Sequence, residues 1–349
     1  MRNKIISFGF IFILLLFFII NIFQNDKEIS VSERRVLTQL PEISKFTEDF
    51  EEYAVDQFWG RDFFRKVKNI YNTNILLQKD TNGYFEKDGA IYKIEYPLKP
   101  ENIKKSTDKI NQICNLFLKN MNVYYSIIPD KNYYLQDDKH LKMDYNELFN
   151  IVNENLKSMK YIDITDKLVL EDFYRTDIHW KQENLLSLAS YMQSEIGKVS
   201  SIYNKELVGN YYGTYYGHIA TFNEVKPDTM YILNNDLIEN CTTYNFETNE
   251  ISKIYDRKST NDKYDIYLSG ATSLIEINNP NAQNENELLL FRDSFGSSIA
   301  PLLVHNYKKV TLIDIRYISY EILDEYIKFG NQDVLFLYSS LVLNQNIFK

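Results

Sequence analysis

The hydrophobic positions divide the chain into an apolar N-terminal segment and a longer region with a mixed pattern. Residues 5–23 are apolar on every side and contain no charged side chain. From residue 43 onward, apolar side chains recur every three or four positions, which predicts a helix, and a second helix is predicted over residues 63–71. Residues 83–93 surround the pair Asp88-Gly89 and predict a hairpin.

Beyond residue 100, short apolar runs alternate with helical patterns. Helices are predicted over residues 101–120, 145–158 and 181–197. Strands are predicted at residues 123–128, 161–164, 288–291, 310–313 and 334–337. Continuous apolar strands separated by helices indicate an α/β domain, in which helices cover both faces of a mostly parallel sheet. Residues 200–285 are rich in Tyr and Asn and predict an irregular insertion with short strands, which would cover or shape a site.

The N-terminal apolar segment is long enough to cross ~30 Å of hydrocarbon as a helix. Arg2 and Lys4 precede it, which places that end in the cytoplasm by the positive-inside rule. No small-residue cleavage site follows Phe23, so an uncleaved signal-anchor is favoured over a cleaved signal peptide or a buried core helix. The chain is thus predicted to be a single-pass protein of the cell membrane with its bulk outside the cytoplasm. The predicted parts are a cytoplasmic N-terminus (1–4), a transmembrane helix (5–23), a polar tether (24–42) and one domain (43–349) with its insertion at about 200–285.

Composition narrows the classes of function. The 349 residues carry a net charge of −9, which argues against nucleic acid as the main partner, because phosphate-binding surfaces are usually basic. A hydrophobic fraction of 44% excludes wholesale disorder. Cys114 and Cys241 allow one disulfide at most, and no cluster of Cys and His suggests a metal site. We therefore expect neither a metal nor a cofactor.

A serine follows one of the predicted strands directly. In parallel sheets, ligand sites gather beyond the carboxyl ends of the strands. The apolar run at 288–291 leads through Asp293 into Ser294 and then into a helical pattern. Backbone N–H groups at such a helix N-terminus favour a developing oxyanion, so Ser294 is a candidate nucleophile. Taken alone, this segment favours the simpler interpretation that Ser294 or Asp293 is only a helix N-cap.

Asp177 and His179 form a second candidate element. In an extended segment, residues two apart leave the same face of the backbone. An Asp in that position can hold one tautomer of the imidazole while the other ring nitrogen faces a nucleophile. A polar turn of this kind also occurs for structural reasons alone. Together with Ser294, however, the pair completes a Ser-His-Asp set.

Three further positions are candidates for supporting roles. Arg316 follows the strand at 310–313 and could pair with a carboxylate, hydrogen-bond a substrate or form an ordinary surface salt bridge. Tyr338 ends the strand after it. The tyrosine-rich segment 211–216 could stack on sugars or simply pack as β structure.

At these residues the sequence resembles the DHHW family, which is related to the SGNH hydrolase-like polysaccharide O-acetyltransferases of the alginate type. The resemblance spans nearly all of the chain outside the apolar segment. Its pieces, in order, are Glu33–Leu37 with Pro41, then Phe50, Tyr53, Asp56, Phe58 and Arg61, then Asp88-Gly89, Ile128–Lys131, Thr176–Trp180, Asp293–Gly296 and Ile313–Tyr317.

The resemblance implies a three-layer α/β/α SGNH hydrolase-like domain with Ser294 as nucleophile, His179 as base and Asp177 as its orienting partner. Two positions depart from the family pattern. Ile178 stands where the family name has its first His. Around Gly270 the chain reads Ser-Gly-Ala-Thr, where relatives tend to show Gly-Gly-Asn, so an oxyanion donor there is missing or supplied elsewhere.

The function that this resemblance implies is O-acyl transfer, with acetyl as the expected group, to a cell-surface or exported polysaccharide. The partners would be the glycan acceptor and a multi-spanning membrane O-acyltransferase, which would deliver the acyl group because acetyl-CoA is cytoplasmic. The same triad could serve a carbohydrate esterase, since the covalent step is shared. A non-catalytic protein of the cell envelope that binds or assembles glycans is the alternative from another class.

Overall fold

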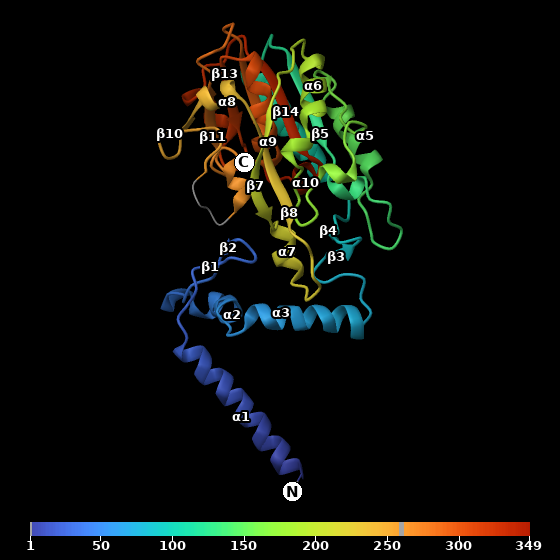
Figure 1. Cartoon of the computed structure of the whole chain (residues 1–349), viewed down its shortest axis with the longest axis vertical. Coiled ribbons are helices and arrows are strands. Elements are labelled where there is room, and N and C mark those ends of the chain that lie inside the picture. The colour runs from blue at the N-terminus through green and yellow to red at the C-terminus, as the bar shows by residue number, and fades with distance from the viewer. Residues whose placement is uncertain (1, 258–261) are drawn as a thin grey trace. The chain divides into compact units, whose positions relative to one another are not determined.

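The computed structural model describes residues 2–257 and 262–349, which form two compact units (Figure 1). Unit 1 comprises Met1–Glu86 and Thr214–Val225, and unit 2 comprises Lys87–Gly213 and Lys226–Lys349. Residues 43–86, which the sequence assigns to the same domain as the sheet, thus pack with the N-terminal segment. Helix α3 (Arg61–Ile70) in this stretch hydrogen-bonds the segment 214–225, which accounts for this grouping.

Unit 1 is mainly helical. Its helix α3 hydrogen-bonds the segment 214–225, because Asn69 donates to the carbonyl of Ile219 (3.1 Å) and Arg65 to that of His218 (3.2 Å). The segment 24–42, predicted as a tether, contains a two-stranded antiparallel pair. The elements of unit 1 are α1 (Arg2–Phe23), β1 (Ile29–Ser30), β2 (Arg35–Val36), α2 (Phe46–Asp56), α3 (Arg61–Ile70), a π-helical turn (Tyr71–Ile75) and α7 (Thr214–Ile219).

An ion cluster joins the β1–β2 turn to helices α2 and α3. Arg35 binds the carboxylate of Asp56 through two nitrogens, at 2.8 and 2.5 Å. Glu33 pairs with Arg61 at 2.5 Å and with Arg65 at 3.1 Å. The hydrogen bond from Arg35 holds the pKa of Asp56 well below its usual range. Several residues that carry the family resemblance in this part of the chain therefore have a structural role.

Helix α1 is apolar along its length, and none of its residues is buried against the rest of the chain. Among the described residues it is the one helix whose length and composition suit it to span a membrane.

Unit 2 is built on an eight-stranded sheet with the order β10-β9-β11-β13-β12-β14-β5-β6. The five strands from β13 to β6 are parallel, and Phe291 of β12 lies between Ile313 of β13 and Phe336 of β14. The strands are β5 (Val123–Ile128), β6 (Lys160–Tyr161), β9 (Thr242–Asn245), β10 (Glu250–Ser252), β11 (Leu274–Asn278), β12 (Glu287–Arg292), β13 (Lys309–Ile313) and β14 (Asp333–Ser339).

Part of the segment 200–285, predicted as an irregular insertion with short strands, joins the central sheet. β11 pairs antiparallel with β13, and β9 pairs with β11, so both strands extend the central sheet. Leu274, Ile275 and Ile277 are buried there, which supplies the reason for the pairing. Earlier in the segment, β7 (Asn204–Tyr211) and β8 (Asp228–Asn234) form a separate antiparallel pair.

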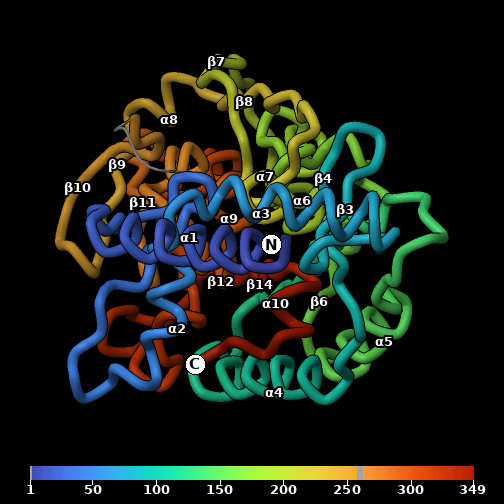
Figure 2. The backbone as a smooth tube through the Cα atoms, turned by 90° about the horizontal axis from the view of Figure 1, so that it is seen from below, coloured from blue at the N-terminus to red at the C-terminus, as the bar shows by residue number. Residues whose placement is uncertain are grey.

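Helices cover both faces of the sheet, which confirms the expected three-layer α/β/α architecture. Side chains of β12 alternate between the two cores, with Leu288 and Leu290 on one face and Leu289 and Phe291 on the other. Figure 2 shows α4 on one side of β12 and β14, and α6 and α9 on the other. The helices are α4 (Pro100–Phe117), α5 (Tyr145–Asn155) and α10 (Ser340–Gln345) on one face and α6 (Leu186–Glu195) and α9 (Ser294–Leu303) on the other.

Candidate active site

The candidate nucleophile lies at the tight turn between strand β12 and helix α9. Asp293 is the N-cap of the helix: one carboxylate oxygen accepts the N–H of Phe295 (3.0 Å), and the other accepts the N–H of Ser339 on β14 (2.8 Å). A Cβ on Gly296 would lie 2.5 Å from Cβ of Arg292, so the turn needs glycine there. Because Asp293 supplies the cap, the hydroxyl of Ser294 is not needed for it.

The structure brings Ser294, His179 and Asp177 together in one hydrogen-bonded chain. Nε2 of His179 lies 2.8 Å from Oγ of Ser294, and Nδ1 lies 2.6 Å from Oδ1 of Asp177. The same carboxylate oxygen accepts the backbone N–H of His179 at 3.0 Å. Asp177 is fully buried, whereas His179 and Ser294 are partly exposed. The arrangement lets Nδ1–H donate to Asp177 while Nε2 accepts the proton of Ser294.

Aromatic packing fixes the imidazole plane. The ring of Tyr264 stacks on His179 with 3.9 Å between centroids and 14° between planes. The hydroxyl of Tyr264 donates to Ser298 (2.9 Å), and the indole of Trp180 donates to the same oxygen (2.8 Å). Ser298 lies one turn after Ser294 on α9, so these contacts attach the loop of His179 to the helix that begins at Ser294. Tyr264 carries no local signal in the sequence that would single it out.

A buried lysine binds the loop that carries His179. Nζ of Lys131 donates to the backbone carbonyls of Asp177 (2.8 Å), Tyr174 (3.1 Å) and Arg175 (3.3 Å). Burial lowers the pKa of Lys131 to about 7. The resemblance includes this lysine within Ile128–Lys131, but the residue pattern alone does not reveal which carbonyls it binds.

Two further residues constrain the same loop. The carboxylate of Asp228 accepts both the N–H (2.9 Å) and the hydroxyl (2.7 Å) of Thr176. Gly213 donates its N–H to the hydroxyl of Thr176 (2.9 Å), and a Cβ on Gly213 would lie 2.1 Å from Cβ of Asp177. The loop therefore keeps Asp177 in place through contacts on several sides.

The expected oxyanion donor near Gly270 is engaged elsewhere. The N–H of Gly270 donates to the carbonyl of Tyr267 (3.3 Å), and the residue has a φ of +89°. The first-turn N–H groups of a helix have no acceptor within the helix. The carboxylate of Asp293 accepts the N–H of Phe295 and its carbonyl accepts that of Gly296, so the N–H of Ser294 is a candidate oxyanion donor.

Arg316 and Tyr338 make contacts of their own outside the hydrogen-bonded chain. Arg316 binds the carboxylate of Asp314 through two nitrogens, at 2.8 and 2.6 Å, so of its predicted roles the pairing with a carboxylate is the one present. Tyr338 points into the core on the α4 side of the sheet and packs on Phe348, with 4.7 Å between ring centroids. Within residues 2–257 and 262–349, neither side chain hydrogen-bonds to Ser294 or His179.

No group of three or more His, Cys, Asp or Glu side chains that could hold a metal ion occurs among the described residues. Cys114 and Cys241 are not paired with each other.

Comparison with known proteins shows similarity to one protein family and a shared fold. Residues 141–313 match the model of the DHHW protein family. Three solved structures are similar over about three quarters of the chain. They are a DHHW family protein from Eubacterium siraeum (19% identity, 77% of this chain and 95% of that chain, TM-score 0.63), PatB1 of Bacillus cereus (21%, 76% and 98%, 0.62) and PatB1 with a sulfonyl adduct (22%, 76% and 99%, 0.59).

None of the curated proteins compared with the chain matches it. At identities below 25%, the structural similarity shows a shared fold. The matched segment contains the Asp177–Trp180 loop and Ser294, the residues at the centre of the resemblance. The comparisons thus confirm the relation of this chain to the DHHW family.

Proposed function

We propose that this chain is an extracytoplasmic O-acyltransferase that moves an acyl group, most simply acetyl, onto a polysaccharide through Ser294, His179 and Asp177. The observation that carries the proposal is the unbroken chain of hydrogen bonds from Asp177 to Ser294 at the start of a helix, with distances of 2.6 and 2.8 Å. The sulfonyl adduct of the similar PatB1 supports the choice of an electrophilic probe.

The first half of the reaction forms an acyl-enzyme. Nε2 of His179 takes the proton of Ser294 while Oγ attacks the carbonyl carbon of the acyl donor. The negative charge that develops on the carbonyl oxygen is stabilised by the N–H of Ser294 and the positive end of α9. The intermediate then collapses, and the leaving group departs with the proton held by His179.

The second half transfers the acyl group. A sugar hydroxyl approaches the acyl-serine, His179 takes its proton, and the hydroxyl oxygen attacks the ester carbonyl. Collapse of the second intermediate returns the proton to Oγ of Ser294 and releases the O-acylated glycan. Throughout, the carboxylate of Asp177 stabilises the imidazolium that forms at each proton transfer. If water replaces the sugar, the same steps give an esterase.

The test measures two things separately: acylation of Ser294 and the transfer of the acyl group to sugar or to water. The full chain, purified in detergent, is incubated with p-nitrophenyl acetate with and without soluble oligosaccharides. We expect rapid quenching and peptide mass spectrometry to find acetyl on Ser294, and added oligosaccharide to gain O-acetyl at the expense of free acetate. Acetate alone as the product would assign the esterase activity instead. Acetyl found only on other residues, with Ser294 unmodified, would contradict the proposal.

In the topology that we propose, the membrane separates the catalytic unit from cytoplasmic acetyl-CoA. We propose that α1 spans the membrane with Arg2 and Lys4 in the cytoplasm, so that the catalytic unit lies outside. A multi-spanning membrane O-acyltransferase would then pass the acyl group across to Ser294.

Protease treatment of intact protoplasts tests this topology. We expect added protease to digest the chain beyond residue 23, while a cytoplasmic marker protein stays intact. Recovery of the undigested full-length chain from intact protoplasts would contradict an external catalytic unit. A shortened chain released into the medium before protease is added would instead identify the apolar segment as a cleaved signal.

A further inference from the structure

The polar face of helix α3 is the one that contacts the rest of unit 1. Arg61 pairs with Glu33, Arg65 binds both Glu33 and the carbonyl of His218, and the buried Asn69 binds the carbonyl of Ile219. These side chains fall on one side of the helix at 3.6 residues per turn. On this face the helix is attached through charges and hydrogen bonds. Ring contacts of Phe64 with Phe17 and of Phe63 with Phe222 (5.9 Å) add to the attachment.

The opposite face of α3 is apolar and exposed. Phe63, Val67 and Ile70 have 57%, 40% and 40% of their surface exposed. The stripe continues past the end of the helix through Tyr71 and Ile75, which are 48% and 65% exposed. A surface helix of a soluble protein has the reverse orientation, with its apolar stripe inward. A contiguous exposed stripe of this length marks a surface that binds a membrane or another protein.

Contacts with α1 show where this stripe begins. The ring of Phe17 packs against Phe58 (5.6 Å), Phe64 (5.7 Å) and Trp59 (6.0 Å). Phe17 precedes the last residue of α1 by six positions, which is about 9 Å at 1.5 Å per residue. Amphipathic helices that lie on membranes bury their apolar face ~5–10 Å into the headgroup and acyl boundary. With α1 in the bilayer, the start of α3 therefore lies at that depth.

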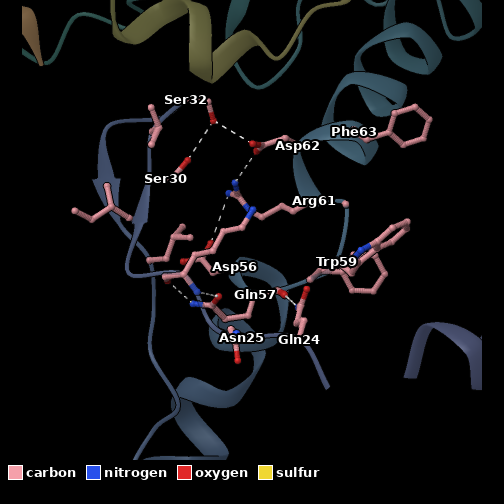
Figure 3. A pocket seen from close by; sticks show the side chains of 16 residues that line it. Gln24, Asn25, Ser30, Ser32, Asp56, Gln57, Trp59, Arg61, Asp62 and Phe63 are labelled. Carbon is pink, nitrogen blue, oxygen red and sulfur yellow. Dashed lines mark hydrogen bonds and ion pairs between the residues drawn. The ribbon is translucent and has the colours of Figure 1, made fainter. Parts of the chain in front are cut away.

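Hydrogen bonds keep the end of α1 attached to the turn before α3. The N–H of Trp59 donates to the side chain of Asn21 (2.8 Å), and the amide of Gln24 donates to the carbonyl of Gln57. Figure 3 shows the pocket of about 700 Å³ at this junction, with polar side chains gathered around Arg61 and the rings of Trp59 and Phe63 to one side of them. The polar and apolar groups are thus separated at the junction itself.

One lysine borders the apolar stripe. At 100° per residue, Lys66 projects about 40° beyond Ile70, at the edge of the face formed by Phe63, Val67 and Ile70, and its ammonium lies 5.5 Å from the centroid of the Phe222 ring. Lysine stems lie along apolar surface while their ammonium groups reach the headgroup layer, where anionic lipids attract them. Trp59, 48% exposed, has the side chain that is most typical of the membrane interface. These features together favour a lipid surface over a protein partner.

We propose that α3 and the turn that follows it lie in the external headgroup layer of the membrane, with the stripe from Phe63 to Ile75 embedded in lipid. The helix is then a second attachment beside α1, and it holds unit 1 flat on the surface. The proposal rests on the topology given above, in which α1 spans the membrane, and it is independent of the catalytic role of Ser294.

Tryptophan fluorescence in vesicles with brominated lipids tests the proposal. The full chain is reconstituted into vesicles of phosphatidylcholine and phosphatidylglycerol and recovered by flotation. Trp59→Phe leaves the fully buried Trp180, which we expect bromine to quench little. In that background, Ile70→Trp and Val67→Trp place reporters on the apolar face, and Asp62→Trp is the matched reporter on the other side of α3. We expect bromine near the headgroups to quench the first two strongly and the third weakly.

The outcomes separate the possible occupants of the stripe. Reporters at Ile70 and Val67 that are quenched no more than the one at Asp62, in chains that float with the vesicles, would overturn the proposal even though α1 is inserted. Disulfide cross-linking between Ile70→Cys chains in such vesicles would then assign the stripe to a second copy. Failure of the chain to float would overturn both this proposal and the topology, while acetylation of Ser294 would still test the catalytic proposal separately.

Discussion

Replacement of Ser294 by alanine is expected to abolish both labelling by a sulfonyl fluoride and the turnover of an activated ester. In the proposed mechanism, Oγ of Ser294 is the atom of the triad that forms a bond to the acyl group, so no acyl-enzyme can form without it. Loss of one member of such a unit costs about 10⁴-fold or more in rate. The measurement is initial rate with p-nitrophenyl acetate, together with mass spectrometry of the chain after treatment with phenylmethanesulfonyl fluoride.

Ser297→Ala is the matched control, because Ser297 is buried in the same helix one turn later and lies outside the triad. The cap of α9 comes from Asp293, so Ser294→Ala should keep the fold and unfold at the same urea concentration as the wild type. A Ser294→Ala chain that still turns over the ester at a wild-type rate would show that the activity arises elsewhere. A binding protein without catalysis would be indifferent to this substitution.

His179→Ala is expected to reduce the same rate by about 10⁴-fold, and the double variant with Ser294→Ala should be hardly slower, because the two residues act as one unit. Added imidazole should restore part of the activity of His179→Ala, since a free base can occupy the space left beside Oγ of Ser294. It should restore nothing in Ser294→Ala. Rates and their dependence on imidazole concentration are the measurement.

The chain supplies a close control for this experiment. His140 and Asp137 form another Asp–His pair, with 2.8 Å between Nδ1 and the carboxylate. This pair has no role in the proposed mechanism, so His140→Ala should retain wild-type turnover. Equal losses in His140→Ala and His179→Ala would show that removal of a histidine disturbs the fold, and would remove the argument for His179 as the base.

The parts of the site that could be predicted are those that depend on local geometry. Asp293 and Ser294 follow a continuous apolar run, which places them at the end of a buried strand whatever the rest of the fold. Asp177 and His179 are two residues apart, and the structure joins them by a hydrogen bond, although the segment is a tight loop closed by the N–H of Tyr174 donating to the carbonyl of His179 (3.0 Å). Their meeting with Ser294 required the resemblance, because nothing local links them.

The parts that could not be predicted depend on contacts between distant segments. Tyr264 lies in a region whose Tyr- and Asn-rich composition gives no sign that one ring stacks on His179. The same composition concealed β9 and β11, whose pairing with the central sheet is decided by buried side chains such as Ile275 and Ile277. Motif residues such as Asp56 belong to an ion cluster in unit 1, and their pattern alone does not separate that role from a catalytic one.

The return of the chain to unit 1 between Thr214 and Val225 means that residues 24–86 cannot be removed without exposing a later part of the chain. A shortened chain that began at residue 87 would keep the segment 214–225 but lose helix α3, which binds that segment. The carbonyls of His218 and Ile219 would lose their donors, and the side chain of Ile219, now 3% exposed, would lose its cover. Soluble versions made for assay or crystallisation should therefore remove α1 alone and retain everything from Gln24 onward.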